Sequence, residues 1–258
     1  MDAFREGVTE RGLWVHRAGR GPRVLLLHGA VLVGELTWRE QLPLAEHWTI
    51  EIVERAGYGR SRSLGPGEDI ELDGRLVAEL LGAGAHLVGQ SSGAVAAMLA
   101  AARRPEAVLS LALSEPPAFQ LAPDSAGAQA MLRGLQALPS IGNDVELLRA
   151  FVELVGSDAV VPDELPPPLA AGAGAVRGIR RVPWEIGLPL EGLAAATFPK
   201  LVISGDHSAA FEAVCDSLAE RIGAERAHVR GARHTTPHAG ESFNRRLEAF
   251  WLTAEAPS

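Results

Sequence analysis

The motif Gly89-x-Ser91-x-Gly93 places a serine between two glycines. This spacing is typical of the sharp strand-to-helix turn that exposes a nucleophilic serine. The serine backbone is strained in such a turn, and the glycines let neighbouring chain segments pass without a Cβ clash. The context fits, because an apolar stretch (85–88) precedes the motif and an alanine-rich segment (94–105) follows it. The motif therefore predicts nucleophilic acyl transfer at this serine.

Acyl transfer also needs two hydrogen-bond donors where the oxyanion of the tetrahedral intermediate forms. The segment His28-Gly29-Ala30 directly follows the apolar run 24–27, so its backbone can approach the serine. We assign the two donors to the main-chain N–H groups of Ala30 and Ser92. We interpret His28 as a structural residue that closes a strand, not as the catalytic base.

The elements that must position these residues alternate along the chain, as in a mostly parallel sheet flanked by helices. Short apolar runs rich in branched side chains predict strands at 24–27, 49–53, 86–89, 108–114, 200–204 and 226–229. Helical spacing of apolar residues predicts helices at 35–46, where a proline breaks the pattern, and at 69–81, 94–105, 211–222 and 241–251. The fold class is therefore α/β.

The alternation stops between residues 115 and 199, a third of the chain that holds 11 of the 17 prolines. Helical patterns recur there in the stretches AGAQAMLRGLQAL and DVELLRAFVELV. Prolines and irregular spacing argue against further sheet in this region. We expect a helical cap, residues 116–198, inserted into a discontinuous core of residues 1–115 and 199–258.

The whole chain resembles the α/β-hydrolase superfamily. The resemblance rests on motifs that occur in the family order: HGA, ERAGYGRS, GQSSG, the proline-rich insertion, LVISGD and GARHTTPH. It implies an α/β-hydrolase fold with a helical cap, Ser91 as nucleophile, Ala30 and Ser92 as oxyanion donors, and His234 as base. His234 also follows the last predicted strand, which places it at the same sheet edge as the serine.

The carboxylate of the expected triad departs from the usual family pattern. Most members carry an aspartate three residues after the glycine that ends the seventh strand, whereas here Ser208 stands three residues after Gly205. A second placement in the superfamily puts the acid after the sixth strand, where Glu115 stands 24 residues beyond the nucleophile. That separation resembles haloalkane dehalogenases and zearalenone-type lactonases. We favour Glu115, with Asp206 as the alternative, as the acid that orients His234 and stabilises its imidazolium.

These residues predict a serine hydrolase that cleaves a small to medium, largely apolar carboxylic ester or lactone through an acyl-enzyme. Haloalkane dehalogenases and epoxide hydrolases of this fold use aspartate at the elbow, where this chain has serine. Apolar cap side chains are the candidates for the substrate pocket: Phe119, Met131, Leu135, Phe151 and Trp184. The alternatives are a C–C hydrolase, perhydrolase or lyase on the same triad, or a non-catalytic ligand-binding member of the fold.

Composition limits the remaining classes. The only cysteine among 258 residues is Cys215, which excludes a disulfide framework. No apolar run approaches 18 residues, and the first thirty residues lack a signal-peptide pattern. The net charge is -8 with scattered basic residues, so we expect no nucleic-acid or membrane partner. The sequence contains no nucleotide-binding motif and no HExxH motif, so we expect no cofactor and no metal. We further expect a cytoplasmic monomer or homodimer that acts on a small molecule.

Overall fold

The computed structural model describes residues 5–65, 67–179 and 181–256. Among them, eight strands form one sheet in the order β1-β2-β4-β3-β5-β6-β7-β8. The strands are β1 (Arg5–Val8), β2 (Trp14–Ala18), β3 (Arg23–Leu27), β4 (Thr49–Val53), β5 (Ala85–Gln90), β6 (Val108–Ser114), β7 (Lys200–Ser204) and β8 (Glu225–His228). β2 pairs antiparallel with β1 and β4, and the other neighbours are parallel. The predicted α/β class with a mostly parallel sheet is confirmed.

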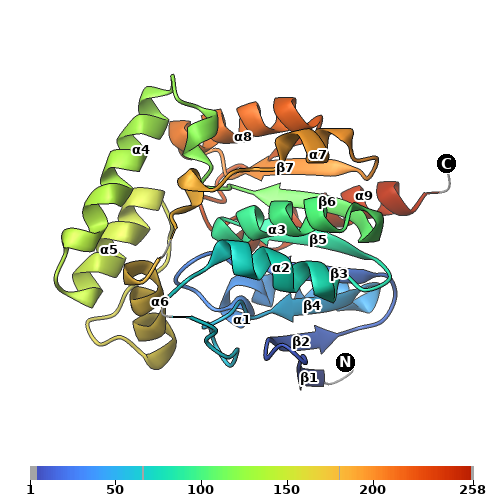
Figure 1. The fold of residues 1–258 in the computed structure, drawn as a ribbon, viewed down its shortest axis with the longest axis horizontal. Coiled ribbons are helices and arrows are strands. Elements are labelled where there is room, and N and C mark those ends of the chain that lie inside the picture. Colours follow the sequence, from blue (N-terminus) through green and yellow to red (C-terminus); the bar gives the residue numbers. More distant parts are fainter. Residues whose placement is uncertain (1–4, 66, 180, 257–258) are drawn as a thin grey trace.

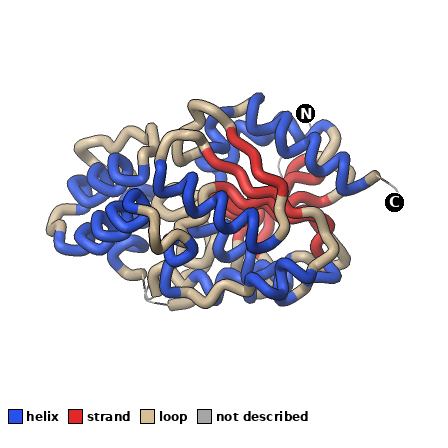
Figure 2. Tube along the Cα trace, turned by 90° about the horizontal axis from the view of Figure 1, so that it is seen from above, coloured by secondary structure: helices blue, strands red, loops and turns tan. Residues whose placement is uncertain are grey.

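Helices cover both faces of the sheet (Figure 2). The α-helices are α1 (Gly34–Trp38), α2 (Ile70–Leu80), α3 (Ser92–Arg103), α4 (Ala126–Ala137), α5 (Asp144–Val155), α6 (Pro167–Arg177), α7 (Leu190–Ala195), α8 (Ala209–Ile222) and α9 (Glu241–Glu255). α2, α3, α7 and α8 share one face, and α1 and α9 pack on the other. None of the helices in the described ranges combines the length and apolar character needed to cross a lipid bilayer.

The central strand β3 explains why the sheet is buried on both sides. Leu25 and Leu27 point into the core beneath α2 and α3, whereas Val24 and Leu26 pack in the second core with α1 and α9. All four side chains are fully buried. A continuous apolar run is what such a strand requires, since successive side chains point to opposite faces.

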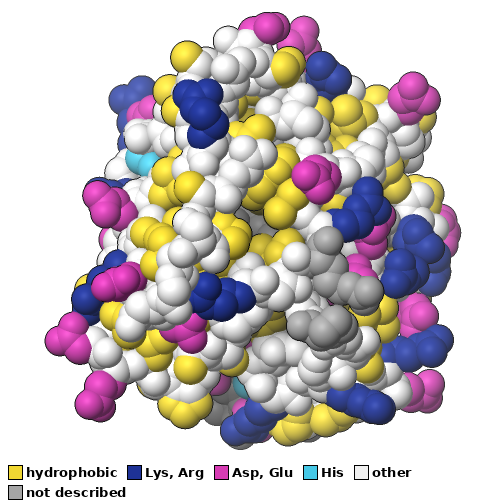
Figure 3. Space-filling view, turned by 60° about the vertical axis from the view of Figure 1, so that its left-hand side comes forward, with side chains coloured by type: hydrophobic (Ala, Val, Ile, Leu, Met, Phe, Trp, Pro, Cys, Tyr) yellow, Lys and Arg dark blue, Asp and Glu magenta, His cyan; other side chains and the backbone are white. Residues whose placement is uncertain are grey.

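Helices α4, α5 and α6 lie together at one end of the sheet, on the left of Figure 1. They come from the region for which a cap is expected, and they share a small apolar core that includes Leu147, Leu148 and Ala173. Seen from this end, hydrophobic side chains surround a hollow in the surface (Figure 3). α6 begins at Pro167. Proline is favourable at the first position of a helix because the N–H that it lacks would have no partner within the helix.

Candidate active site

The candidate catalytic residues follow parallel strands and therefore lie at the same edge of the sheet. Ser91 follows β5, Glu115 follows β6, and His234 lies in the loop between β8 and α9. All three are buried, with exposed fractions of 7%, 0% and 5%. The sheet thus brings together residues separated by up to 143 positions in the sequence.

The turn at Ser91 has the strained backbone expected of a nucleophile elbow, with φ 54° and ψ −128°. Gly89 and Gly93 are needed because the surrounding chain is too close for side chains. A Cβ at Gly93 would lie 2.5 Å from the Leu27 carbonyl oxygen, and one at Gly89 would lie 2.5 Å from the Cα of Ala94. The Ser91 N–H donates to the carbonyl of Ser114 at 2.9 Å, which ties the elbow to the neighbouring strand β6.

A chain of hydrogen bonds joins the three side chains. Ser91 Oγ lies 3.1 Å from His234 Nε2, and His234 Nδ1 lies 2.7 Å from Glu115 Oε2. A carboxylate can only accept, so Nδ1 carries the imidazole proton and Nε2 presents a lone pair to the serine hydroxyl. This arrangement can remove the hydroxyl proton as the serine attacks a carbonyl.

Glu115 accepts more hydrogen bonds than the triad requires. Its Oε1 accepts from the N–H of Gly205 at 2.7 Å, and its Oε2 accepts from a second histidine, His207 Nε2, at 2.9 Å. Burial acts to raise the pKa of Glu115, but hydrogen bonds from His207 and His234 outweigh it, so the pKa is lowered. The carboxylate therefore stays ionised although it is buried. His207 was missed from the sequence, where its only signal was its place in the turn that follows a strand, three residues after Ser204.

The structure does not bring the alternative acid, Asp206, to His234. Its carboxylate is 49% exposed and lies 3.8 Å from Arg230 Nε. Asp206 has a positive φ of 55°, in the turn that brings the next residue, His207, to Glu115.

The loop that carries His234 is held on several sides. Phe211 of α8 stacks on the imidazole, with ring centroids 4.5 Å apart. The His234 carbonyl accepts from Gln90 Nε2 at 3.1 Å, and its N–H donates to the carbonyl of Gly156 at 3.3 Å. Gly156 ends α5 in the left-handed conformation, and a Cβ there would lie 2.7 Å from His207 Nδ1. The end of α5 therefore contacts both histidines that bond to Glu115.

The expected oxyanion donors, Ala30 and Ser92, line the same cavity as Ser91 and His234. A buried arginine, Arg55, supports the loop beneath them: its Nη2 donates to the Gly29 carbonyl at 2.8 Å and its Nε donates to the His28 carbonyl at 2.9 Å. His28 Nε2 accepts a hydrogen bond from the main-chain N–H of Arg55 at 3.0 Å. Burial and the Arg55 charge hold the pKa of His28 well below its usual range, so His28 is neutral.

A mostly apolar cavity of about 130 Å³ lies above the elbow. Of the predicted substrate-binding residues, four line it: Phe119, Leu135, Phe151 and Trp184. Met131 does not, because it is buried in the main core with side chains of α8. The lining residues that sequence reasoning missed include Glu68, Pro117, Val155, Val176 and Phe211.

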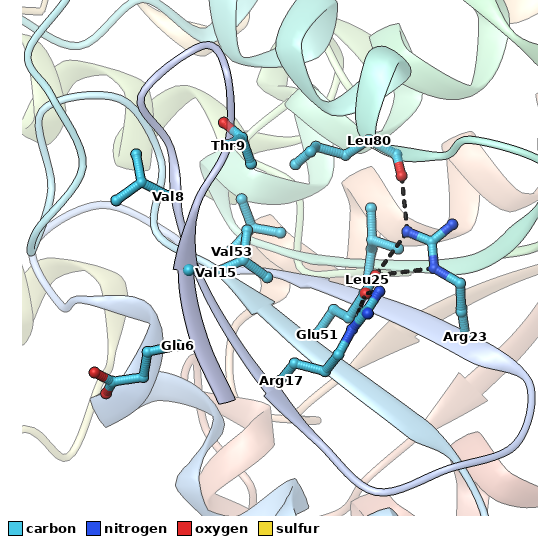
Figure 4. Close-up of a pocket in the computed structure, with 11 residues that line it drawn as sticks. Glu6, Val8, Thr9, Val15, Arg17, Arg23, Leu25, Glu51, Val53 and Leu80 are labelled. Carbon is cyan, nitrogen blue, oxygen red and sulfur yellow. Dashed lines mark hydrogen bonds and ion pairs between the residues drawn. The ribbon is translucent and has the colours of Figure 1, made fainter. Parts of the chain in front are cut away.

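A second cavity, of about 320 Å³, lies beside β1 and β2, at one edge of the sheet (Figure 4). Its charged groups already have partners, because Glu51 accepts hydrogen bonds from both Arg17 and Arg23 and Glu6 forms an ion pair with Arg60. No serine, cysteine or histidine occurs among the described residues that line it. Its described lining therefore lacks the serine and histidine on which the chemistry expected here depends.

Among the residues that the structure describes, two groups of side chains have a composition that could hold a metal ion. Glu115, His207 and His234 bring one ligand atom each within 4.8 Å of one another, and so do three residues nearer the surface, Asp206, Glu212 and His228. In the first group the same atoms already form hydrogen bonds, which explains their proximity without an ion.

Comparison with known proteins gives the same fold. A sequence model described as the alpha/beta hydrolase family matches residues 24–250. Pimeloyl-[acyl-carrier protein] methyl ester esterases of Methylococcus capsulatus and Chromobacterium violaceum are 36% identical over 103 residues and 38% identical over 101. These matches span 40% and 39% of this chain and the same shares of the relatives' length.

Solved structures match over nearly the whole chain. An α/β hydrolase from Sphaerobacter thermophilus is 25% identical with a TM-score of 0.66, covering 96% of this chain and 100% of that one. The N-acyl homoserine lactonase AidH, complexed with N-butanoyl homoserine, is 18% identical with a TM-score of 0.74, covering 99% and 98%. The fold predicted from the sequence is confirmed. Since the family match covers most of its length, this chain belongs to the α/β-hydrolase family.

Proposed function

We propose that this protein is a serine hydrolase that cleaves a small to medium, largely apolar carboxylic ester or lactone. One observation carries the proposal: the buried chain of hydrogen bonds from Ser91 through His234 to Glu115, at 3.1 and 2.7 Å, beneath an apolar cavity. The partial similarity to methyl ester esterases supports an ester as the substrate.

In the first half of the reaction, Ser91 Oγ attacks the substrate carbonyl while His234 Nε2 takes the hydroxyl proton. The main-chain N–H groups of Ala30 and Ser92 stabilise the oxyanion, and Glu115 stabilises the imidazolium. When the tetrahedral intermediate collapses, the bond to the leaving oxygen breaks and His234 returns the proton to that oxygen. The products are an alcohol and an acyl-enzyme; for a lactone, the hydroxyl stays attached to the acyl group.

In the second half, water attacks the acyl carbonyl and gives its proton to His234. The Ser91 Oγ–acyl bond then breaks, the serine recovers the proton, and the carboxylic acid leaves. Every proton passes through His234 Nε2, and each turnover consumes one ester or lactone and one water and regenerates the enzyme.

We further propose that residues 116–198 act as a cap on the core. Phe119, Phe151 and Trp184 come from this region and line the cavity together with the nucleophile. Such side chains would hold the apolar part of the substrate and limit the access of bulk water to the reacting groups.

Two measurements test the function: covalent labelling by a fluorophosphonate, and turnover of p-nitrophenyl acetate and butyrate. We expect stoichiometric labelling of wild type and none of Ser91→Ala. The variant should keep only residual catalysis, about three to four orders of magnitude above water, from the oxyanion donors and binding. Full activity in Ser91→Ala would refute the proposal.

A further inference from the structure

The cavity above Ser91 contains a buried carboxylate that the proposed reaction does not use. Glu68 lines the cavity, although its side chain is only 1% exposed. Its Oε2 accepts hydrogen bonds from Tyr58 Oη at 2.5 Å and from Arg55 Nη2 at 3.2 Å. Its Oε1 is buried and has no hydrogen-bond partner in the part of the chain that the structure describes. An unpaired acceptor in a buried site is unfavourable, which points to a partner supplied by a ligand.

Arg55 links Glu68 to the place where the reacting carbonyl would lie. The Nη2 that contacts Glu68 also donates to the Gly29 carbonyl at 2.8 Å and lies 3.4 Å from Ser92 Oγ. One nitrogen therefore bridges Glu68 and both segments that carry the proposed oxyanion donors. The carboxylate lies within about two hydrogen-bond lengths of those segments. A substrate group only a few covalent bonds from the scissile carbonyl can reach it.

The charges around Glu68 favour a hydrogen-bond donor over an acceptor. A single guanidinium, that of Arg55, faces two buried carboxylates: Glu68, and Asp73 Oδ2 at 2.9 Å from its Nη1. Burial raises the pKa of Asp73 to about 6, so this carboxyl is ionised at neutral pH and takes up part of the Arg55 charge. A substrate oxygen at this position would be repelled, whereas an N–H or O–H would be attracted.

We propose that Glu68 Oε1 is a specificity-determining acceptor that binds a substrate N–H or O–H group close to the scissile carbonyl. This inference rests on the proposed hydrolase function and narrows its substrates to esters or lactones that carry an amide N–H or a hydroxyl beside the reacting centre. The apolar residues of the same cavity, such as Phe151 and Trp184, hold the rest of the substrate.

The test compares two methyl esters of equal length. Methyl N-butanoylglycinate carries an amide N–H beside the ester, and methyl 4-oxoheptanoate has a CH2 in its place. The kcat/KM of each is measured by acid release and divided by its rate of hydrolysis by hydroxide, which removes the difference in intrinsic reactivity. For wild type we expect the N–H ester to be favoured by about 10- to 100-fold, the effect of one hydrogen bond to a buried charged group.

Glu68→Gln replaces one carboxylate oxygen by an NH2 group while keeping the shape of the side chain. Its amide oxygen can keep the bonds from Tyr58 and Arg55, so its NH2 group replaces Oε1 and presents a donor. We expect the preference for the N–H ester to disappear. The matched control is Asp73→Asn, which removes the same charge from the cluster at a residue that does not line the cavity; its preference should match that of wild type.

The outcomes separate this inference from the function on which it rests. Equal preferences in wild type and Glu68→Gln, with both esters hydrolysed, would overturn the role of Glu68 alone. An equal loss in Asp73→Asn would also overturn it, because the cluster charge would then be the cause. Failure of both esters together with absence of fluorophosphonate labelling would overturn the hydrolase proposal. If circular dichroism shows that Glu68→Gln is unfolded, the preference of wild type for the N–H ester decides the question. The absence of that preference overturns the inference.

Discussion

The role of Glu115 can be tested by Glu115→Gln, a change that keeps the shape of the side chain. In the wild type, Oε1 accepts one N–H, from Gly205, and Oε2 accepts two, from His207 and His234. A glutamine has one oxygen for these two positions, so its NH2 group faces a donor in either orientation. If NH2 faces His234, the imidazole proton must move to Nε2, and the base can no longer accept the serine proton.

The size of the effect follows from this tautomer change and the lost charge. We expect kcat for p-nitrophenyl butyrate to fall about 10³- to 10⁴-fold, with a parallel fall in the rate of fluorophosphonate labelling. The control is Asp206→Asn, whose exposed carboxylate does not contact His234; its kcat should stay within about twofold of wild type. Circular dichroism checks that both variants fold. A nearly active Glu115→Gln beside a crippled Asp206→Asn would identify Asp206 as the acid and refute the reasoning.

Two further predictions concern residues near the site. His207→Ala removes one of two donors to Glu115 Oε2, so kcat should fall about tenfold and His207→Gln should restore part of it. The loss of this donor raises the pKa of Glu115, so the acid limb of the kcat–pH profile should move to higher pH; an unmoved limb would mean that His207 only packs. Burial raises the folded-state pKa of Asp73 to about 6, above its unfolded value, so the folded state binds this proton more tightly. Its contribution to the free energy of unfolding therefore rises as the pH falls from 6 towards the unfolded value. Asp73→Asn lacks this contribution. As the pH is lowered across this range, its free energy of unfolding, measured with urea, should therefore rise less or fall more than that of wild type. Equal slopes for the two proteins would contradict the assignment.

The central part of the fold could be predicted from the sequence because its signals are local. The run 24–27 is apolar at every position, since β3 is buried on both faces, and the predicted strand differs from the observed one by a single residue. β1 and β2 were not predicted, because their outer position in the sheet leaves exposed and half-buried residues without a clear alternation. What holds β2 in place includes the ion pair of Arg17 with Glu51 on β4, a contact that only the folded sheet creates.

The site residues also differ in whether a local pattern in the sequence reveals them. Ser91 carries a strong signal because its strained turn demands glycines on both sides. The contact between His207 and Glu115 spans 92 positions and depends on the turn after β7, so no local pattern reveals it. Met131 and Leu135 lie four residues apart on α4, so helical spacing cannot separate them. α4 starts against α8, where a Cβ at Gly127 would lie 3.1 Å from the Ala210 nitrogen, and only its later part reaches the cavity.

The glycine that ends α5 limits how this chain can be altered by recombination. The Gly156 carbonyl accepts hydrogen bonds from the N–H of His234 and from Arg233 Nε, and the missing side chain leaves room for His207. A segment grafted from a relative to change substrate range would therefore have to reproduce a left-handed glycine at this junction. Exchanges confined to α4 and α6 leave the junction intact. Residues of α4 and α6 can thus vary while the contact between Gly156 and the loop that carries His234 stays fixed.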